Sequence, residues 1–383
     1  MSTSGSAKYG AATTWATRIA FSINGFGIAA WAPLVPYVKL QAGVDERQLG
    51  LLLLCMGLGS ILCMPLAGAM ASKTGCRQVI VFGVLGMCVA LPLLAFTSDP
   101  RLLALVLFLF GAAFGAEGVA MNMQAVLVET VSEKSMMSGF HGFYSLGGIF
   151  GALVVSVLLG VKIAPFFVAA IVALIILIFL LIIWQALIPA GVGKRGPVFA
   201  WPKGKILVIG IICFITFLVE GSVLDWSAIQ LTDFRKATPS EAGLGYAAFA
   251  LAMTVGRFWG DRAVQFFGGI RVSIYGCLIA ALGFFLSVHF YSMLWVGLVG
   301  FGLVGLGCSN IVPIMYSLTG KQTSVPQSVA IPAISTMGYA GILVGPSIIG
   351  FIAHTFQLDV ALLGISVLLL ALMVLIATMI NKP

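Results

Sequence analysis

Charged residues are scarce in this chain of 383 residues. Asp, Glu, Lys and Arg together make up 8% of it, whereas hydrophobic residues make up 61%. Soluble domains carry about 25% charged residues, so this composition does not cover a water-facing surface. The scarcity of charge excludes a soluble globular protein and predicts an all-α membrane protein that crosses the bilayer many times.

Motifs for catalysis, metal binding and disulfides are also missing. The seven cysteines form no CxxC pair and lie mostly in apolar runs, which favours small core residues. None of the three histidines belongs to an HExxH-like spacing, so we expect no enzyme, no metal and no cofactor. The basic residues are dispersed, which argues against a nucleic-acid partner despite a net charge of +8. The first residues show no pattern of a cleavable signal peptide.

Long apolar segments dominate what is present. A helix needs about 20 mostly apolar residues to cross the hydrocarbon of a bilayer. Twelve segments qualify, and the one long segment rich in Gly, Pro and Lys separates the sixth from the seventh. We therefore expect an N-terminal six-helix bundle over 1–188, a cytoplasmic linker over 189–204 and a C-terminal six-helix bundle over 205–383. The predicted spans are 15–38, 48–71, 77–97, 102–129, 138–161, 163–188, 205–231, 240–264, 271–291, 293–318, 327–353 and 359–380.

The distribution of lysine and arginine predicts the orientation, because cytoplasmic loops carry an excess of both. With the N-terminus inside, fourteen of the 20 lysines and arginines lie in cytoplasmic segments. We therefore expect both termini in the cytoplasm. The six that fall outside are Lys39, Arg47, Arg101, Lys162, Arg235 and Lys236.

The two halves repeat several features at a nearly constant offset. Such matches predict a duplicated six-helix unit, an arrangement in which substrate binds between the halves near the midplane. The matches are Asn24-Gly25 with Glu220-Gly221, GCR (75–77) with GIR (269–271), Glu117 with Asn310, and Gly147 and Gly151 with Gly341 and Gly345.

Two loops carry a resemblance to a known family. GAMASKTGCR (68–77) resembles the G-x-x-x-D-R/K-x-G-x-R/K signature of the major facilitator superfamily, with Ser72 where Asp is usual. GRFWGDRAVQFFGGIR (256–271) keeps the acid as Asp261. HGFYSLG (141–147) and EGSVLDW (220–226) resemble a bacterial inner-membrane branch that is distantly similar to fucose–proton symporters. The resemblance covers essentially the whole chain and implies an alternating-access transporter of the bacterial inner membrane.

In that family these loops are implied to form charge and helix-dipole latches that hold one access state. Because Ser72 replaces the usual acid, we expect Asp261 to contribute more to holding that state. The residues that we assign to gating or to the latch are Lys73, Gly75, Arg77, His141, Arg257, Asp261, Arg262 and Arg271.

Two glutamates, Glu117 and Glu220, lie deep in their predicted helices, where a charge costs ~2.5–3.5 kcal/mol. We expect no basic residue to pair with either, because the nearest, Arg18 and Arg257, are predicted near cytoplasmic helix ends. An unpaired deep glutamate is protonated when occluded and releases its proton when wetted. We therefore predict proton coupling at Glu117, with Glu220 as a substrate ligand or second proton site.

Candidate substrate residues follow from the resemblance, which implies that the first, fourth, fifth, seventh, tenth and eleventh spans line the cavity. Interhelical hydrogen bonding explains the deep amides equally well, and packing explains the tyrosines equally well. The candidates on these spans are Asn24, Trp31, Gln124, Tyr144, Asp225, Asn310 and Tyr339.

The predicted function is symport of a small neutral polar solute with protons, by a monomer whose other partner is the lipid bilayer. Amides, hydroxyls and aromatic rings suit such a solute, whereas anions are usually held by Arg or Lys. Proton-driven export of an organic cation is the alternative, weakened by Ala152 where the family's antiporter motif has proline. A channel and an intramembrane enzyme are more remote alternatives.

Overall fold

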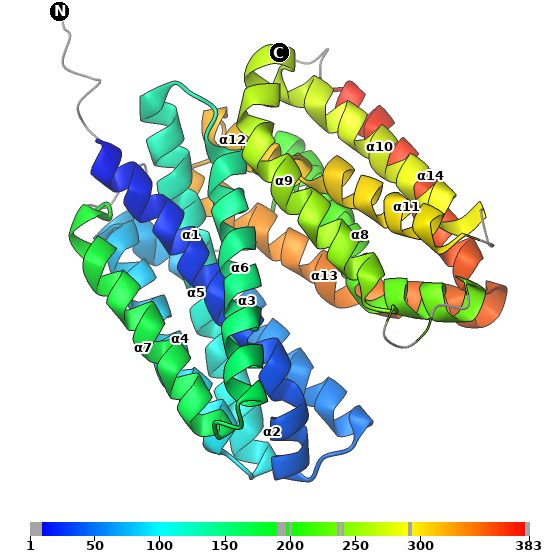
Figure 1. Ribbon diagram of the computed structural model, residues 1–383. Coiled ribbons are helices and arrows are strands. Elements are labelled where there is room, and N and C mark those ends of the chain that lie inside the picture. The colour runs from blue at the N-terminus through cyan, green and yellow to red at the C-terminus, as the bar shows by residue number, and fades with distance from the viewer. Residues whose placement is uncertain are drawn as a thin grey trace, which may run out of the picture. The chain divides into compact units, whose positions relative to one another are not determined.

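The computed structural model describes residues 10–189, 197–198, 201–235, 238, 241–289 and 293–379, and within them all regular structure is helical (Figure 1). Two short 3-10 turns, η1 (Ala32–Leu34) and η2 (Trp184–Ala186), follow α1 and α7. The α-helices are α1 (Ala11–Trp31), α2 (Val35–Ala42), α3 (Glu46–Thr74), α4 (Cys76–Phe96), α5 (Pro100–Ser132), α6 (Met137–Gly160), α7 (Pro165–Ile183), α8 (Gly204–Arg235), α9 (Leu244–Phe267), α10 (Gly269–His289), α11 (Leu294–Cys308), α12 (Ile311–Lys321), α13 (Gln327–Phe356) and α14 (Leu358–Ala377).

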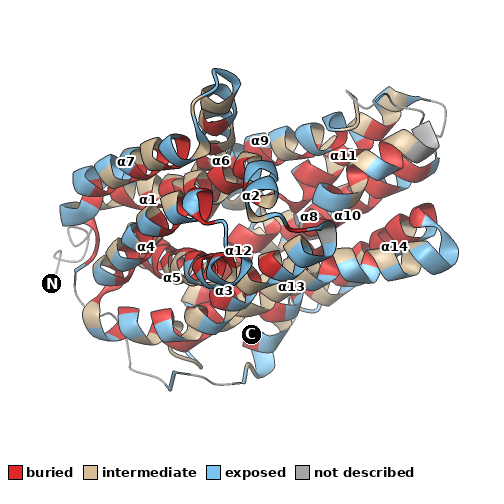
Figure 2. Ribbon diagram, turned by 90° about the horizontal axis from the view of Figure 1, so that it is seen from below, coloured by how far each residue is buried: buried red, intermediate tan, exposed pale blue. Residues whose placement is uncertain are grey.

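Eleven helical segments of the described chain are long and apolar enough to span a membrane, counting α1 with α2 and α11 with α12 as one each. The remaining predicted span is α9, whose hydropathy is lowered by Arg257, Asp261 and Arg262. Buried and exposed residues occupy different faces of these helices (Figure 2), as expected where one face packs on neighbours and the other meets lipid. The prediction of an all-α membrane protein with twelve long helical segments is confirmed.

Two of the predicted spans, 15–38 and 293–318, each contain two helices in the structure, which we did not predict from the sequence. Proline explains both breaks, because it has no N–H to donate and its ring displaces the carbonyl group four residues earlier. Pro33 lies in η1 and Pro36 in the first turn of α2. Pro313 lies in the first turn of α12, and the helix breaks at Ser309 and Asn310.

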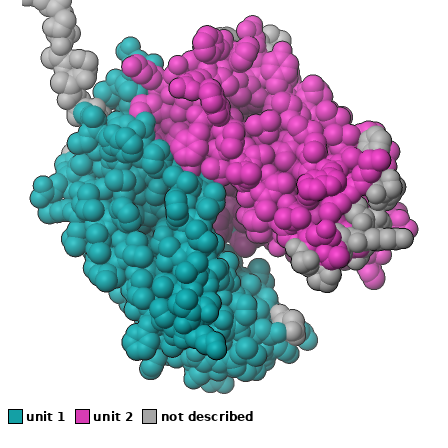
Figure 3. All heavy atoms as spheres, viewed as in Figure 1, with its two compact units in different colours: residues 1–133, 143–201, 320–336 teal, residues 134–142, 202–319, 337–383 magenta. Residues whose placement is uncertain are grey.

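The chain forms two compact units (Figure 3). Unit 1 comprises residues 1–133, 143–201 and 320–336, and unit 2 comprises residues 134–142, 202–319 and 337–383. Both α6 and α13 therefore contribute residues to each unit. Most of the predicted linker, residues 190–196 and 199–200, lies outside the described residues, so the boundary at 189–204 stays a prediction.

Closely packed glycines join helices within each unit. In unit 1, a methyl group on Gly147 of α6 would overlap the carbonyl oxygen of Ser22 on α1. In unit 2, Gly341 of α13 lies against the carbonyl oxygen of Phe214 on α8 in the same way. These glycines were matched between the two halves of the sequence, and the structure shows that they permit close helix approach.

Candidate functional site

Asn24 and Glu117 meet in the interior of unit 1. The amide Nδ2 of Asn24 donates to Glu117 Oε2 at 3.1 Å and to the carbonyl oxygen of Phe114 at 3.3 Å. The two side chains are 1% and 0% exposed. Glu117 Oε1 has no hydrogen-bond partner, and no ion pair with Glu117 forms among the described residues. A deep carboxyl group is therefore held by one neutral donor.

Gln124 forms a second contact between the same two helices, seven residues further along α5. Its Nε2 donates to Thr17 Oγ1 on α1 at 3.0 Å, and its Oε1 accepts from the backbone N–H of Ile188 at 3.0 Å. Thr17 and Asn24 on α1, like Glu117 and Gln124 on α5, are seven residues apart and share a helix face, and the two faces meet. Gln124 uses both ends of its amide to join three segments, which supports a structural role rather than substrate contact.

Glu220 and Arg257 form an ion pair inside unit 2. Arg257 Nη2 lies 3.8 Å from Glu220 Oε2, and the side chains are 6% and 13% exposed. Arg257 lies well inside α9, so the predictions that it is near a helix end and that no basic residue pairs with Glu220 are wrong. The sequence did not indicate this pairing because it depends on how α8 packs against α9. Glu220 Oε1 has no hydrogen-bond partner among the described residues.

The break between α11 and α12 supplies a second contact for Arg257. Pro313 has no N–H to donate to the carbonyl group of Ser309, and that oxygen instead accepts from Arg257 Nε at 3.4 Å. The neighbouring Asn310 donates its Nδ2 to the carbonyl oxygen of Gly256 at 3.1 Å. Asn310 Oδ1 has no partner in the described part of the chain. Pro313 was the sequence signal for this arrangement, and the initial prediction of the spans missed it.

Asp261, the residue expected to dominate the latch, binds the start of α6 within unit 2. Its Oδ1 accepts from the backbone N–H of Ser138 at 3.0 Å, and its Oδ2 accepts from that of Gly139 at 2.8 Å. The first N–H groups of a helix have no intrahelical acceptor and carry a partial positive charge, so this carboxylate is favourably placed. His141, one turn further along α6, lies beside Tyr316 with ring centroids 5.7 Å apart.

The other predicted latch residues have separate surroundings. Gly75 adopts φ 95° between α3 and α4, and Gly268 adopts φ 80° between α9 and α10, conformations that favour glycine. Arg77 donates its Nε to the carbonyl oxygen of Leu187 at 3.1 Å, which ties α4 to the segment after α7 inside unit 1. The latch residues with exposed side chains are Lys73, Arg262 and Arg271.

The remaining substrate candidates differ in burial. Trp31 is buried, and its Nε1 has no hydrogen-bond partner among the described residues. Tyr144 in unit 1 and Tyr339 in unit 2 are half-buried, whereas Asp225 on α8 is exposed. Their roles in binding a solute stay predictions.

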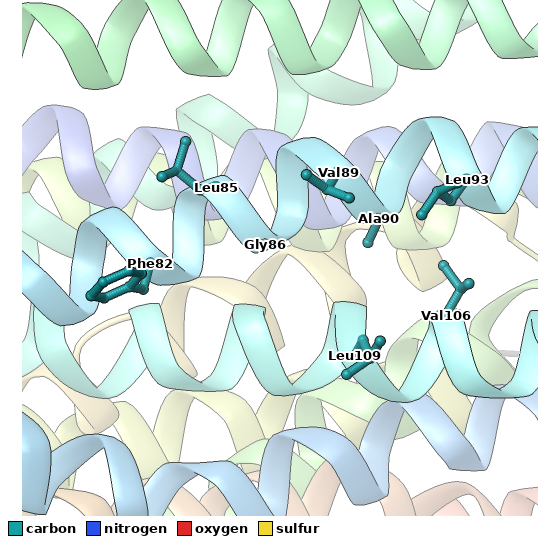
Figure 4. Close-up of a pocket in the computed structure, with 8 residues that line it drawn as sticks. All are labelled: Phe82, Leu85, Gly86, Val89, Ala90, Leu93, Val106 and Leu109. Carbon is teal, nitrogen blue, oxygen red and sulfur yellow. The ribbon is translucent and has the colours of Figure 1, made fainter.

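One pocket of unit 1 lies between α4 and α5 (Figure 4). Its lining contains no side chain that forms hydrogen bonds, so it does not suit a polar solute. The lining residues are Phe82, Leu85, Gly86, Val89, Ala90, Leu93, Val106 and Leu109.

Comparisons with known proteins agree with this architecture. The Major Facilitator Superfamily model matches residues 19–226. The chain is 48% identical over 357 residues to an uncharacterised transporter of this type from Yersinia pestis, covering 92% of each chain. It is 34% identical over 358 residues to membrane protein MosC of Rhizobium meliloti, covering 92% of this chain and 86% of the relative.

A solved structure shares the fold. The crystal structure of the fucose:proton symporter of E. coli superposes with a TM-score of 0.75 at 17% sequence identity, covering 95% of this chain and 98% of that one. The family match, the two relatives and the shared fold lead to one conclusion: the chain belongs to the major facilitator superfamily and is a multi-pass membrane protein that works as a secondary transporter, not as an enzyme.

Proposed function

We propose that this transporter couples protons to the import of a small neutral polar solute, and that Glu117 carries the coupled proton. The observation that carries the proposal is the setting of Glu117: it is fully buried, has one amide donor and forms no ion pair in the described chain. A carboxylate shielded from water without a counter-charge costs several kcal/mol, so the group holds a proton while enclosed. Opening to water removes this cost and allows the proton to leave.

The charges buried in unit 2 favour a neutral solute. Arg257 is neutralised by Glu220, so the deep guanidinium is not free to hold an anion and the carboxylate is not free to hold an organic cation. This replaces the expectation that no arginine lies deep. Unpartnered polar atoms remain at Glu220 Oε1, Asn310 Oδ1 and Trp226 Nε1, which suit a solute that forms hydrogen bonds without net charge. The fold shared with a fucose:proton symporter is consistent with this solute class.

Transport in proteoliposomes tests the proton assignment. A solute is first selected from sugars, polyols and nucleosides by its effect on thermal stability, because a ligand of the folded state raises the unfolding temperature. Glu117→Gln is then expected to abolish accumulation driven by a pH step while preserving exchange of solute across the membrane. Glu133→Gln, which removes an exposed charge at the end of the same helix, is the matched control and retains accumulation. Accumulation by the Glu117→Gln protein against a gradient refutes the assignment.

The solute class has a separate test on solid-supported membranes. We expect saturable currents with a neutral solute and none with multiply charged anions. Saturable transport of such an anion, unchanged when Arg18 and Arg257 are replaced, overturns the argument from charge. Proton efflux that depends on an organic cation favours the antiporter instead.

A further inference from the structure

The exposed face of α9 changes character along its length. Leu251 and Val255 come first, followed by Trp259, which is 61% exposed, and then by the exposed Arg262. Apolar, then aromatic, then cationic side chains occur in this order where a helix passes from the hydrocarbon into the headgroup region of a bilayer. The end of α9 is therefore placed at the membrane–water interface.

The charge of Arg262 is not balanced within the described chain. Its guanidinium carbon lies 4.8 Å from the ring centroid of Trp259, a cation–π contact, and no described acid forms an ion pair with it. The carboxylate of the adjacent Asp261 forms no ion pair with Arg262 and accepts backbone N–H groups from the start of α6. Arg262 is exposed.

Two more exposed aromatic residues and a second exposed arginine follow along the chain. Phe266 is 85% exposed and Phe267 is 60% exposed at the end of α9. Arg271, also exposed, lies in the first turn of α10 and forms no ion pair among the described residues. We call Trp259, Arg262, Phe266, Phe267 and Arg271 the α9–α10 patch.

We propose that the α9–α10 patch binds the phosphate headgroup of an anionic phospholipid. A planar guanidinium matches the oxygens of a phosphate diester and is weakly hydrated, which suits it to this role. Leu251, Val255 and Trp259 place exposed apolar area on the hydrocarbon side of Arg262, where acyl chains begin, so a lipid satisfies the patch better than a free anion does. The site is independent of proton coupling. It lies on the helix that also carries Arg257 and Asp261, so bound lipid acts directly on the element that contacts α8 and α6.

Lipid titration of the purified full-length protein tests the proposal. Native mass spectrometry in detergent measures the affinity for phosphatidylglycerol and for phosphatidylcholine. Each cation near an anionic lipid contributes about 1 kcal/mol, so Arg262→Gln/Arg271→Gln is expected to weaken phosphatidylglycerol binding roughly 10- to 30-fold, with phosphatidylcholine unaffected. The matched control, Arg47→Gln/Lys162→Gln, removes two exposed cations from unit 1, whereas the patch lies in unit 2, and it leaves the affinity unchanged.

Two further variants and a competition measurement complete the test. If the double variant does not fold, Arg271→Gln alone is expected to weaken binding roughly threefold to fivefold, and Trp259→Leu tests the ring with both charges kept. The proposal is overturned if the patch and control variants lose affinity for phosphatidylglycerol equally, or if neither loses affinity. Displacement of the lipid by millimolar inorganic phosphate identifies an open anion site and also overturns it.

Discussion

Glu117 in unit 1 and Glu220 in unit 2 have different partners. Glu117 accepts a hydrogen bond from the neutral amide of Asn24, whereas Glu220 lies 3.8 Å from the guanidinium of Arg257. A neutral partner stabilises a carboxyl group but does not cancel its charge, so Glu117 becomes neutral only by binding a proton. Glu220 is balanced without one. The difference supports our proposal that the coupled proton is carried in unit 1, whereas unit 2 holds an ion pair.

The two sites also differ in where the acid and the amide lie. The sequence repeat matches Asn24 to Glu220 and Glu117 to Asn310, so the acid and the amide have exchanged helices between the halves. In unit 2, Arg257 contacts Glu220 and the carbonyl oxygen of Ser309, the neighbour of Asn310. An arginine contact thus replaces the direct contact between acid and amide seen in unit 1.

The contact of α9 with the start of α6 also differs from the contact of α3 with α13 that the sequence repeat matches to it. Asp261 of α9 accepts two N–H groups of α6. Ser72 of α3 donates its hydroxyl to the carbonyl oxygen of Ala69 on its own helix, at 2.8 Å. The α3–α13 contact includes the hydroxyl of Thr336 donating to the sulfur of Met64 at 3.8 Å. A charged cap is therefore present in only one of the two contacts.

The largest expected effect comes from breaking the ion pair of unit 2. Arg257→Met leaves Glu220 buried without a counter-charge, and the free energy of unfolding is expected to fall by about 3–5 kcal/mol. The double variant Arg257→Met/Glu220→Leu is expected to recover most of this loss, because well-packed apolar groups replace both charges. Unfolding in sodium dodecyl sulfate, followed by circular dichroism, measures both. A loss below ~1 kcal/mol for the single variant shows that the pair behaves as a solvated one.

A smaller loss is expected at the corresponding contact of unit 1. Asn24→Ala removes the donor to Glu117 Oε2 but leaves no unpaired charge when the carboxyl group is protonated. The free energy of unfolding is expected to fall by about 1–3 kcal/mol in the same assay. Asn24→Leu, which fills more of the space, separates lost packing from the lost hydrogen bond. A loss at Asn24 that equals the loss at Arg257 contradicts the contrast between the two glutamates.

The smallest effect is expected at the start of α6. Asp261→Asn keeps one acceptor but removes the negative charge, which contributes about 0.3–1 kcal/mol at a helix N-terminus. We expect a roughly twofold to fivefold change in the labelling rate of a single reporter cysteine in an otherwise cysteine-free chain. Ser72→Ala serves as the control and leaves labelling unchanged. If the Asp261→Asn and parent proteins are labelled at the same rate from both sides of the membrane, the hypothesis that Asp261 acts as a latch is refuted.

Much of the architecture could be predicted from the sequence, because it depends on residues that are close together in the chain. Long apolar segments must become helices in a bilayer, because every backbone polar group needs a partner there, and their lengths located all twelve. The seven-residue spacing of Thr17 with Asn24, and of Glu117 with Gln124, is visible in the sequence and puts each pair on one helix face. Pro313 also indicates a helix break, but the predicted span 293–318 was drawn from its long apolar sequence and did not include this break.

The sequence by itself therefore determined the helices, their amphipathic faces and the presence of two deep acids. Only the tertiary structure decided what each acid meets: Glu117 meets an amide, and Glu220 meets Arg257 on another helix. It also decided that Gln124 is held by Ile188 and that Asp261 reaches the start of α6 across more than a hundred residues. Helix periodicity is a property of neighbouring residues, whereas the partner of a side chain is set by helices that pack together from distant parts of the chain.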